Sequence, residues 1–199
     1  VAVLVGTDES SVRFVRKKSE LAAKLGIKFE TCSFSDSISE EMLIKEVEKI
    51  SKRQDVGGMI VQLPLPAKIN RRKILDSISP SKDIDCLTTE NLKKFYSGDF
   101  KLVSPTVGAL IAILKYLNIL NLKNKKTTVV GAGVLVGEPV ATWLKYHGAH
   151  VGIVDQSTKQ EERSQALKKA EIVVSGVGKA KLITGNDISP NSTIIDFGY

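Results

Sequence analysis

The hexapeptide Val61-Gln62-Leu63-Pro64-Leu65-Pro66 shows where a strand of the N-terminal half of the chain ends. It follows an apolar run, residues 56–60, that is typical of a buried parallel strand. The two prolines lack the amide hydrogen that a central strand needs, so the strand must end near Gln62. Ligands of open α/β sheets bind beyond the carboxyl ends of strands. Gln62 is therefore expected to lie where a ligand binds. The plainer alternative is a stiff loop after a core strand.

Strand and helix signals alternate before this hexapeptide. Asp8 or Ser10 is expected to cap a helix that runs to about residue 25, where Gly26 ends it. Ser37 or Ser39 is expected to start a second helix, with acidic residues in its first turn. Together with apolar strands at residues 1–5, 27–34 and 57–62, these helices predict a βαβαβ unit.

A second series of strands and helices follows the hexapeptide. Residues 106–117 form an apolar helix, and the lysine-rich residues 118–126 are a plausible domain boundary. Strands are expected at residues 127–130, 150–154, 172–175 and 193–197. The sequence therefore predicts an α/β protein of two lobes across a cleft, an N-terminal α/β lobe (1–118) and a C-terminal Rossmann-type lobe (119–199). Because the chain starts and stops on core strands, we expect terminal segments to be missing at both ends.

Composition narrows the class of protein. The 199 residues carry a net charge of +7, and the lysines are scattered. Scattered lysines usually form a solvated surface, and the functional alternative is attraction of anionic small molecules. Nucleic-acid binding would need a basic stripe interleaved with aromatic residues, which is absent. No run has the length of a membrane span and no secretory signal is present, so a cytoplasmic protein is expected. Cys32 and Cys86 lack metal-type spacing and are expected to be free thiols, so no metal site is predicted.

A glycine-rich turn follows the first strand of the second series. The residues are Val129-Val130-Gly131-Ala132-Gly133-Val134-Leu135-Val136-Gly137. Gly131 permits the tight turn, Gly133 lets the backbone approach a pyrophosphate, and Gly137 allows close packing of helix on strand. The predicted cofactor contacts in this turn are Gly131, Ala132, Gly133, Val134 and Gly137. A tight turn without any ligand is the alternative.

Asp155 lies just past the next strand, where an acidic side chain grips the ribose hydroxyls of a dinucleotide. A carboxylate there accepts from both hydroxyls of NAD and repels the 2′-phosphate of NADP. We therefore expect NAD to be favoured, with Gln156 beside it, although Lys159 and Arg163 could still support NADP. Further cofactor contacts are predicted after two other strands, at Ser175, Gly176, Val177, Gly178, Gly198 and Tyr199.

The hexapeptide and a second motif, Ser81-Lys82-Asp83-Ile84-Asp85, resemble the methylenetetrahydrofolate dehydrogenase/methenyltetrahydrofolate cyclohydrolase family of the FolD type. The resemblance extends over the whole chain, from Val1 to Tyr199. It implies oxidation of 5,10-methylenetetrahydrofolate with NAD or NADP, the family norm being NADP, and hydrolysis of the product to 10-formyltetrahydrofolate. It also implies that residues 1–118 are the folate-binding catalytic lobe, that residues 119–199 are the dinucleotide-binding lobe, and that the chain forms a homodimer through the nucleotide-binding lobe.

The family carries a tyrosine, and a catalytic lysine four residues later. Phe14 and Lys18 match these positions. The resemblance implies that Lys18 is the general acid/base, that Gln62 positions it, and that Asp85 hydrogen-bonds the pterin ring. The implied substrate contacts are Ser11, Phe14, Lys18, Gln62, Leu63, Pro64 and Asp85.

Several positions depart from the family pattern. Phe14 replaces a tyrosine, Cys86 replaces the glycine after the aspartate, and residues 103–107 differ from the usual Pro-Cys-Thr-Pro. The segment Pro-Gly-Gly-Val-Gly-Pro does not appear. Two alternatives therefore stay open. One is a degenerate, non-catalytic folate- or nucleotide-binding protein, and the other is a two-lobed oxidoreductase of the shikimate dehydrogenase kind.

Overall fold

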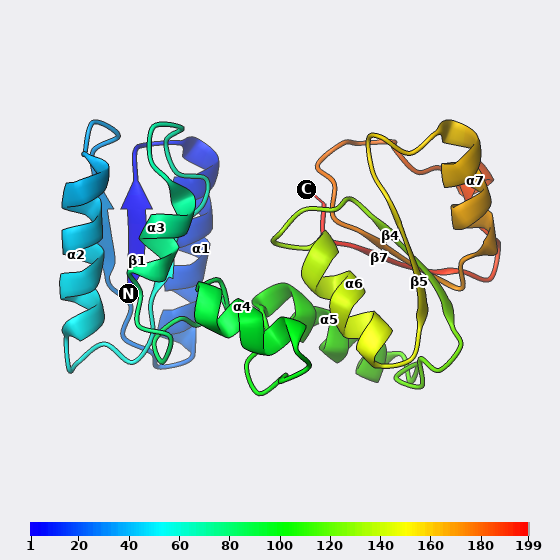
Figure 1. Cartoon of the computed structure of the whole chain (residues 1–199), viewed down its shortest axis with the longest axis horizontal. Coiled ribbons are helices and arrows are strands. Elements are labelled where there is room, and N and C mark those ends of the chain that lie inside the picture. The colour runs from blue at the N-terminus through cyan, green and yellow to red at the C-terminus, as the bar shows by residue number, and fades with distance from the viewer. Residues whose placement is uncertain (199) are drawn as a thin grey trace. The chain divides into compact units, whose positions relative to one another are not determined.

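A computed structural model describes residues 1–198 of the chain (Figure 1). The chain divides into two compact units, and the division lies between Leu102 and Val103. The sequence placed the boundary after residue 118, behind the apolar helix α5 (Pro105–Tyr116). In the structure α5 belongs to the second unit, because it packs against α6 (Gly137–Tyr146) there.

The first unit is a three-stranded parallel sheet with helices on both faces. Its strands are β1 (Ala2–Val5), β2 (Thr31–Phe34) and β3 (Ile60–Val61), in the order β2-β1-β3. The helices are α1 (Glu9–Lys24), α2 (Glu40–Lys52), α3 (Arg71–Asp76) and α4 (Thr89–Tyr96). Figure 1 shows α1 and α2 on opposite sides of β1.

Alternation of side chains along β1 explains how one strand holds two layers of helix. Val3 and Val5 pack into a cluster with apolar residues of α2 and α3. Ala2 and Leu4 point the other way and pack with Val15 of α1. Since successive strand residues face opposite sides of the sheet, a strand buried on both faces must be apolar throughout, and all four residues of β1 are buried.

Two strands are shorter than the sequence predicts. The prediction of a strand from residue 27 is wrong at its start, because Gly26 takes a positive φ of 71° and the N–H of Ile27 donates to the carbonyl of Ala22, which completes the end of α1. The strand predicted over residues 57–62 pairs with β1 only at Ile60–Val61. Met59 instead forms an isolated parallel bridge with Asp83.

The second unit is a four-stranded parallel sheet with the order β5-β4-β6-β7. Its strands are β4 (Lys126–Val130), β5 (His150–Val154), β6 (Ile172–Ser175) and β7 (Thr193–Asp196). Helix α7 (Gln160–Lys169) and the short η1 (Gly185–Asp187) complete it. Figure 1 shows α6 and α7 on opposite sides of this sheet. The arrangement confirms the predicted α/β class with a Rossmann-type second half.

Among residues 1–198, no helix combines the length and the apolar character that crossing a bilayer requires. Cys32 and Cys86 are both free, as predicted.

Candidate active site and dinucleotide site

Lys18 and Gln62 come together in the first unit. Lys18 lies on α1, and Gln62 follows β3 directly. The Lys18 Nζ donates a hydrogen bond of 3.3 Å to Oε1 of Gln62. The other end of the amide is fixed as well, because Nε2 of Gln62 donates to the carbonyl of Leu63 at 2.7 Å. This second bond orients the amide so that its oxygen faces the amine.

Phe14 covers one side of the lysine. The Lys18 Nζ lies 5.1 Å from the centroid of the Phe14 ring, within the range of a cation–π contact. Phe14 itself is 44% exposed, far more than a core aromatic residue. An exposed ring beside a half-buried amine offers an apolar face to a flat substrate.

Lys18 and Asp85 influence each other electrostatically. Burial lowers the pKa of the Lys18 amine, and the negative charge of Asp85 opposes that shift. Burial raises the pKa of the Asp85 carboxyl, with Lys18 opposing and the charge of Asp83 adding to the rise. The amine therefore loses its proton more readily than a surface lysine, which suits a group that transfers protons.

Cys86 shows why a glycine suits the position after the aspartate. Its backbone has a φ of 57°, in the left-handed region that favours glycine. The side chain is buried, and burial raises the pKa of its thiol to about 11. The thiol therefore stays protonated near neutral pH, and the turn keeps a left-handed shape without the glycine.

The remaining predicted substrate contacts, Ser11, Leu63 and Pro64, differ in their surroundings. Ser11 is buried in the first turn of α1, where its N–H donates to the capping carboxylate of Asp8 at 2.8 Å. Leu63 packs against the core of the first unit, and Pro64, joined to it by a cis peptide bond, is exposed. Of these three residues, Leu63 touches the Lys18–Gln62 pair through the amide of Gln62.

The glycine-rich turn of the second unit borders a cavity of about 990 Å³. Segments that follow three of the parallel strands line it, as expected at the carboxyl ends of a sheet. The predicted contacts that line it are Gly131, Ala132, Gly133, Asp155, Gln156, Gly176, Val177 and Gly178. Ser157, Lys179 and Leu182 line it too and were not predicted, because nothing in their spacing marks them. Arg163 of α7 is a further lining residue.

The three glycines of the turn differ in what surrounds them. Gly131 has a φ of 99°, which L side chains rarely adopt. A Cβ on Gly137 would lie 1.9 Å from the carbonyl oxygen of Gly131, so only glycine allows this approach. A Cβ on Gly133 would meet nothing within 4 Å. Gly137 thus serves packing, whereas Gly133 leaves the backbone open to a ligand.

Asp155 directly follows β5, and one of its carboxylate oxygens accepts hydrogen bonds within the chain. Its Oδ1 accepts from the N–H of Ser157 at 2.8 Å and from the Ser157 hydroxyl at 2.6 Å. These hydrogen bonds from Ser157 hold the pKa of the Asp155 carboxyl below its ordinary value. The group is therefore ionised at neutral pH, as a ribose-binding carboxylate must be.

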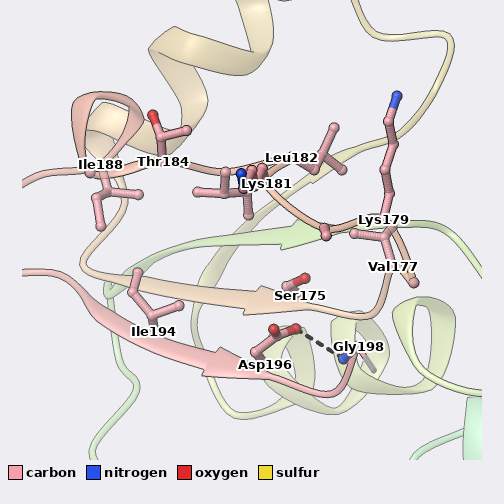
Figure 2. Close-up of a pocket in the computed structure, with 14 residues that line it drawn as sticks. Ser175, Val177, Lys179, Lys181, Leu182, Thr184, Ile188, Ile194, Asp196 and Gly198 are labelled. Atoms are coloured by element: carbon pink, nitrogen blue, oxygen red, sulfur yellow. Dashed lines mark hydrogen bonds between the residues drawn. The ribbon is translucent and has the colours of Figure 1, made fainter.

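A second cavity of about 470 Å³ lies beside β6 and β7 (Figure 2). Ser175, Val177 and Gly178 line it, together with Asp196 and Gly198. Figure 2 shows the N–H of Gly198 donating to Oδ1 of Asp196, a bond of 2.9 Å. Two predicted cofactor contacts remain. Tyr199 lies outside the described residues, and Val134 is exposed on the turn before α6.

The parallel sheet, the glycine-rich turn and the acidic residue after β5 define a dinucleotide-binding protein. Comparison with known proteins carries this further. The catalytic-domain model of the tetrahydrofolate dehydrogenase/cyclohydrolase family matches residues 1–85, and its NAD(P)-binding-domain model matches residues 104–199. The chain therefore belongs to the tetrahydrofolate dehydrogenase/cyclohydrolase family.

Individual relatives agree with the family match. The bifunctional protein FolD of Clostridium beijerinckii is 34% identical over 197 residues, which cover 99% of this chain and 69% of the relative. The methylenetetrahydrofolate dehydrogenase-cyclohydrolase of Trypanosoma brucei, solved with NADP and an inhibitor, has a TM-score of 0.94 at 29% identity. That match covers 99% of this chain and 67% of the other.

The bifunctional FolD enzyme of Campylobacter jejuni has a TM-score of 0.92 at 27% identity, covering 97% of this chain and 68% of the other. The likeness to shikimate dehydrogenase of Thermus thermophilus is one of fold alone, at a TM-score of 0.60 and 15% identity. This family match therefore favours the folate enzyme over the shikimate alternative.

Proposed function

We propose that this chain oxidises 5,10-methylenetetrahydrofolate to 5,10-methenyltetrahydrofolate with NAD or NADP, and hydrolyses the product to 10-formyltetrahydrofolate. The observation that carries the proposal is the Lys18–Gln62 hydrogen bond with Asp85 acting on the same amine. These three residues lie in the region matched by the family's catalytic domain. The degenerate, non-catalytic alternative finds no support in the relatives, whose names are those of enzymes.

The dinucleotide, when bound, supplies the acceptor for a hydride from the substrate. The residues of the second unit fit such a group. Gly133 leaves space for a pyrophosphate, Gly137 lets the helix begin close to the turn, and Asp155 presents an ionised carboxylate to a ribose. The protein's part in oxidation is mainly to hold donor and acceptor carbons together.

Hydrolysis of the methenyl cation needs a group that manages protons of water and of the ring nitrogens. Lys18 suits this role because burial lowers the pKa of its amine and so favours the neutral form relative to a surface lysine, and a neutral amine does not repel the cation. Gln62 orients the amine without adding charge. We infer that Asp85 accepts from the pterin amino group and ring N–H as a paired contact.

Substitution of Lys18 tests this assignment. Lys18→Met keeps the length of the side chain and removes the amine, so cyclohydrolase activity should fall by about 10²–10⁴-fold. Dinucleotide affinity should stay unchanged, because Lys18 lies outside the second unit. Lys17→Met at the exposed neighbouring position is the matched control and should keep both activities. A Lys18→Met enzyme that still hydrolyses the methenyl compound would refute the role.

We also propose that the chain forms a homodimer through its nucleotide-binding unit. Strand β5 lies at one edge of that sheet, and exposes His150, Gly152 and Ile153. An uncovered edge strand is a surface that proteins commonly pair or protect. Sedimentation equilibrium should give about twice the 21.6 kDa chain mass, and a monomer at micromolar concentration would contradict the proposal.

A further inference from the structure

Asp83 is a buried carboxylate two residues before Asp85. It is 2% exposed, and its oxygens accept hydrogen bonds from four neutral donors. Oδ2 accepts from the N–H of Leu87 at 2.9 Å, the N–H and hydroxyl of Thr88 at 2.8 Å each, and Nδ2 of Asn91 at 2.9 Å. A buried charge is tolerated only when donors surround it in this way.

The backbone of the same residue is tied to the strand that leads to Gln62. Met59 forms a parallel bridge with Asp83, and its N–H donates to the carbonyl of Lys82 at 2.7 Å. Met59 immediately precedes β3, and Gln62 immediately follows it. Asn91 adds a tie from the far side, because its Nδ2 also donates to the carbonyl of Pro80 at 2.9 Å.

Residues 84–87 thus form a turn whose two ends are closed by one carboxylate. The turn contains Asp85 at its centre and Cys86 in the left-handed region. A non-glycine residue held at positive φ costs energy, so the turn would relax if the hydrogen bonds to Leu87 and Thr88 were lost. Relaxation would move Asp85 relative to Lys18.

We propose that Asp83 is a positioning residue, whose carboxylate holds the 84–87 turn so that Asp85 faces Lys18 and the substrate. The inference rests on the proposed function, because it assigns Asp85 to the folate site. Asp83 contacts no reacting group and is not itself catalytic. Its effect comes through geometry, and a misplacement of about 1 Å at a reacting site can cost about 100-fold in rate.

Two substitutions remove parts of the clamp. Asp83→Asn keeps the shape but replaces a charged acceptor with an amide. Thr88→Val keeps the shape of the threonine and removes one donor to Asp83, whereas Thr88→Ser keeps that donor and is the matched control.

We expect Asp83→Asn and Thr88→Val to lower kcat/KM for methylenetetrahydrofolate by about tenfold or more, with dinucleotide affinity unchanged. Thr88→Ser should keep the wild-type value, with every variant measured well below its melting temperature. If Asp83→Asn does not fold, the Thr88 pair decides. Loss of melting temperature with unchanged kcat/KM in Thr88→Val would overturn the proposal.

A spectroscopic readout separates this inference from the proposed function. Asp85 raises the pKa of Lys18, so Asp85→Asn should lower the Lys18 titration midpoint in lysine ¹³Cε NMR. Thr88→Val should shift the midpoint in the same direction, because it displaces Asp85, and an unchanged midpoint would contradict positioning. A wild-type chain that turns over no folate would contradict the proposed function, while leaving this titration able to support or refute the clamp.

Discussion

Single residues decide which dinucleotide the second unit prefers. The Asp155 carboxylate lines the cavity, and Ser157 fixes its Oδ1. A fixed negative charge repels a 2′-phosphate, and a residue with a neutral hydroxyl would not. Arg163 lines the same cavity and acts in the opposite direction, since its guanidinium can pair with a phosphate.

We therefore expect a higher kcat/KM with NAD than with NADP, by about tenfold, the equivalent of 1.4 kcal/mol. Asp155→Ser should shift the ratio towards NADP, and Arg163→Gln should shift it further towards NAD. Initial rates with both cofactors at fixed folate concentration measure the ratios. A strong NADP preference in the unsubstituted enzyme would contradict the predicted preference for NAD.

At the scale of the element, the glycine-rich turn is expected to affect both stability and cofactor binding. Gly137→Ala places a Cβ 1.9 Å from the backbone oxygen of Gly131, which cannot yield as a flexible side chain would. It should cost about 1–3 kcal/mol in the free energy of unfolding. Gly133→Ala meets no atom, and its unfolding free energy should stay within about 0.5 kcal/mol of the unsubstituted protein.

Substitution of Gly133 is expected to act on dinucleotide affinity and not on stability. Gly133→Ala should weaken affinity by about tenfold, because its methyl group points where the pyrophosphate approaches. Urea unfolding and calorimetric titration of both variants test this pair. Equal affinity in Gly133→Ala and the unsubstituted protein would show that the backbone at Gly133 does not meet the cofactor.

The sequence predicted most elements, because apolar runs and helix caps are local signals. Asp8 and Ser39 cap α1 and α2 as expected. The end of the strand before Gln62 was also predictable, since prolines cannot continue it. The start of that strand was not, because it depends on the bridge from Met59 to Asp83.

The contacts within the site, unlike the elements, do not follow from local signals. Lys18 and Gln62 are 44 residues apart, and nothing in their spacing shows that a hydrogen bond joins them. Their pairing came from the family resemblance. The role of Asp83 cannot be predicted from the motif, because two aspartates in one motif look alike in sequence until their hydrogen-bond donors are known.

At the scale of the whole molecule, the two units would carry complementary parts of the proposed reaction. The first holds Lys18, Gln62 and Asp85, and the second holds the glycine-rich turn and Asp155, the residue proposed to bind the ribose. The net charge of +7 suits both partners, since dinucleotides and the glutamate tails of folates are anionic. Neither unit alone contains the groups for both hydride transfer and hydrolysis.

The most direct test is a spectrophotometric assay of the purified chain with methylenetetrahydrofolate and either NAD or NADP. Methenyl and reduced-nicotinamide absorbance are followed together. We predict that reduced nicotinamide forms without accumulation of methenyltetrahydrofolate, because the same chain hydrolyses it. Accumulation of the methenyl compound would contradict the hydrolase assignment. No reduced nicotinamide with either cofactor, from a folded sample, would contradict the account as a whole.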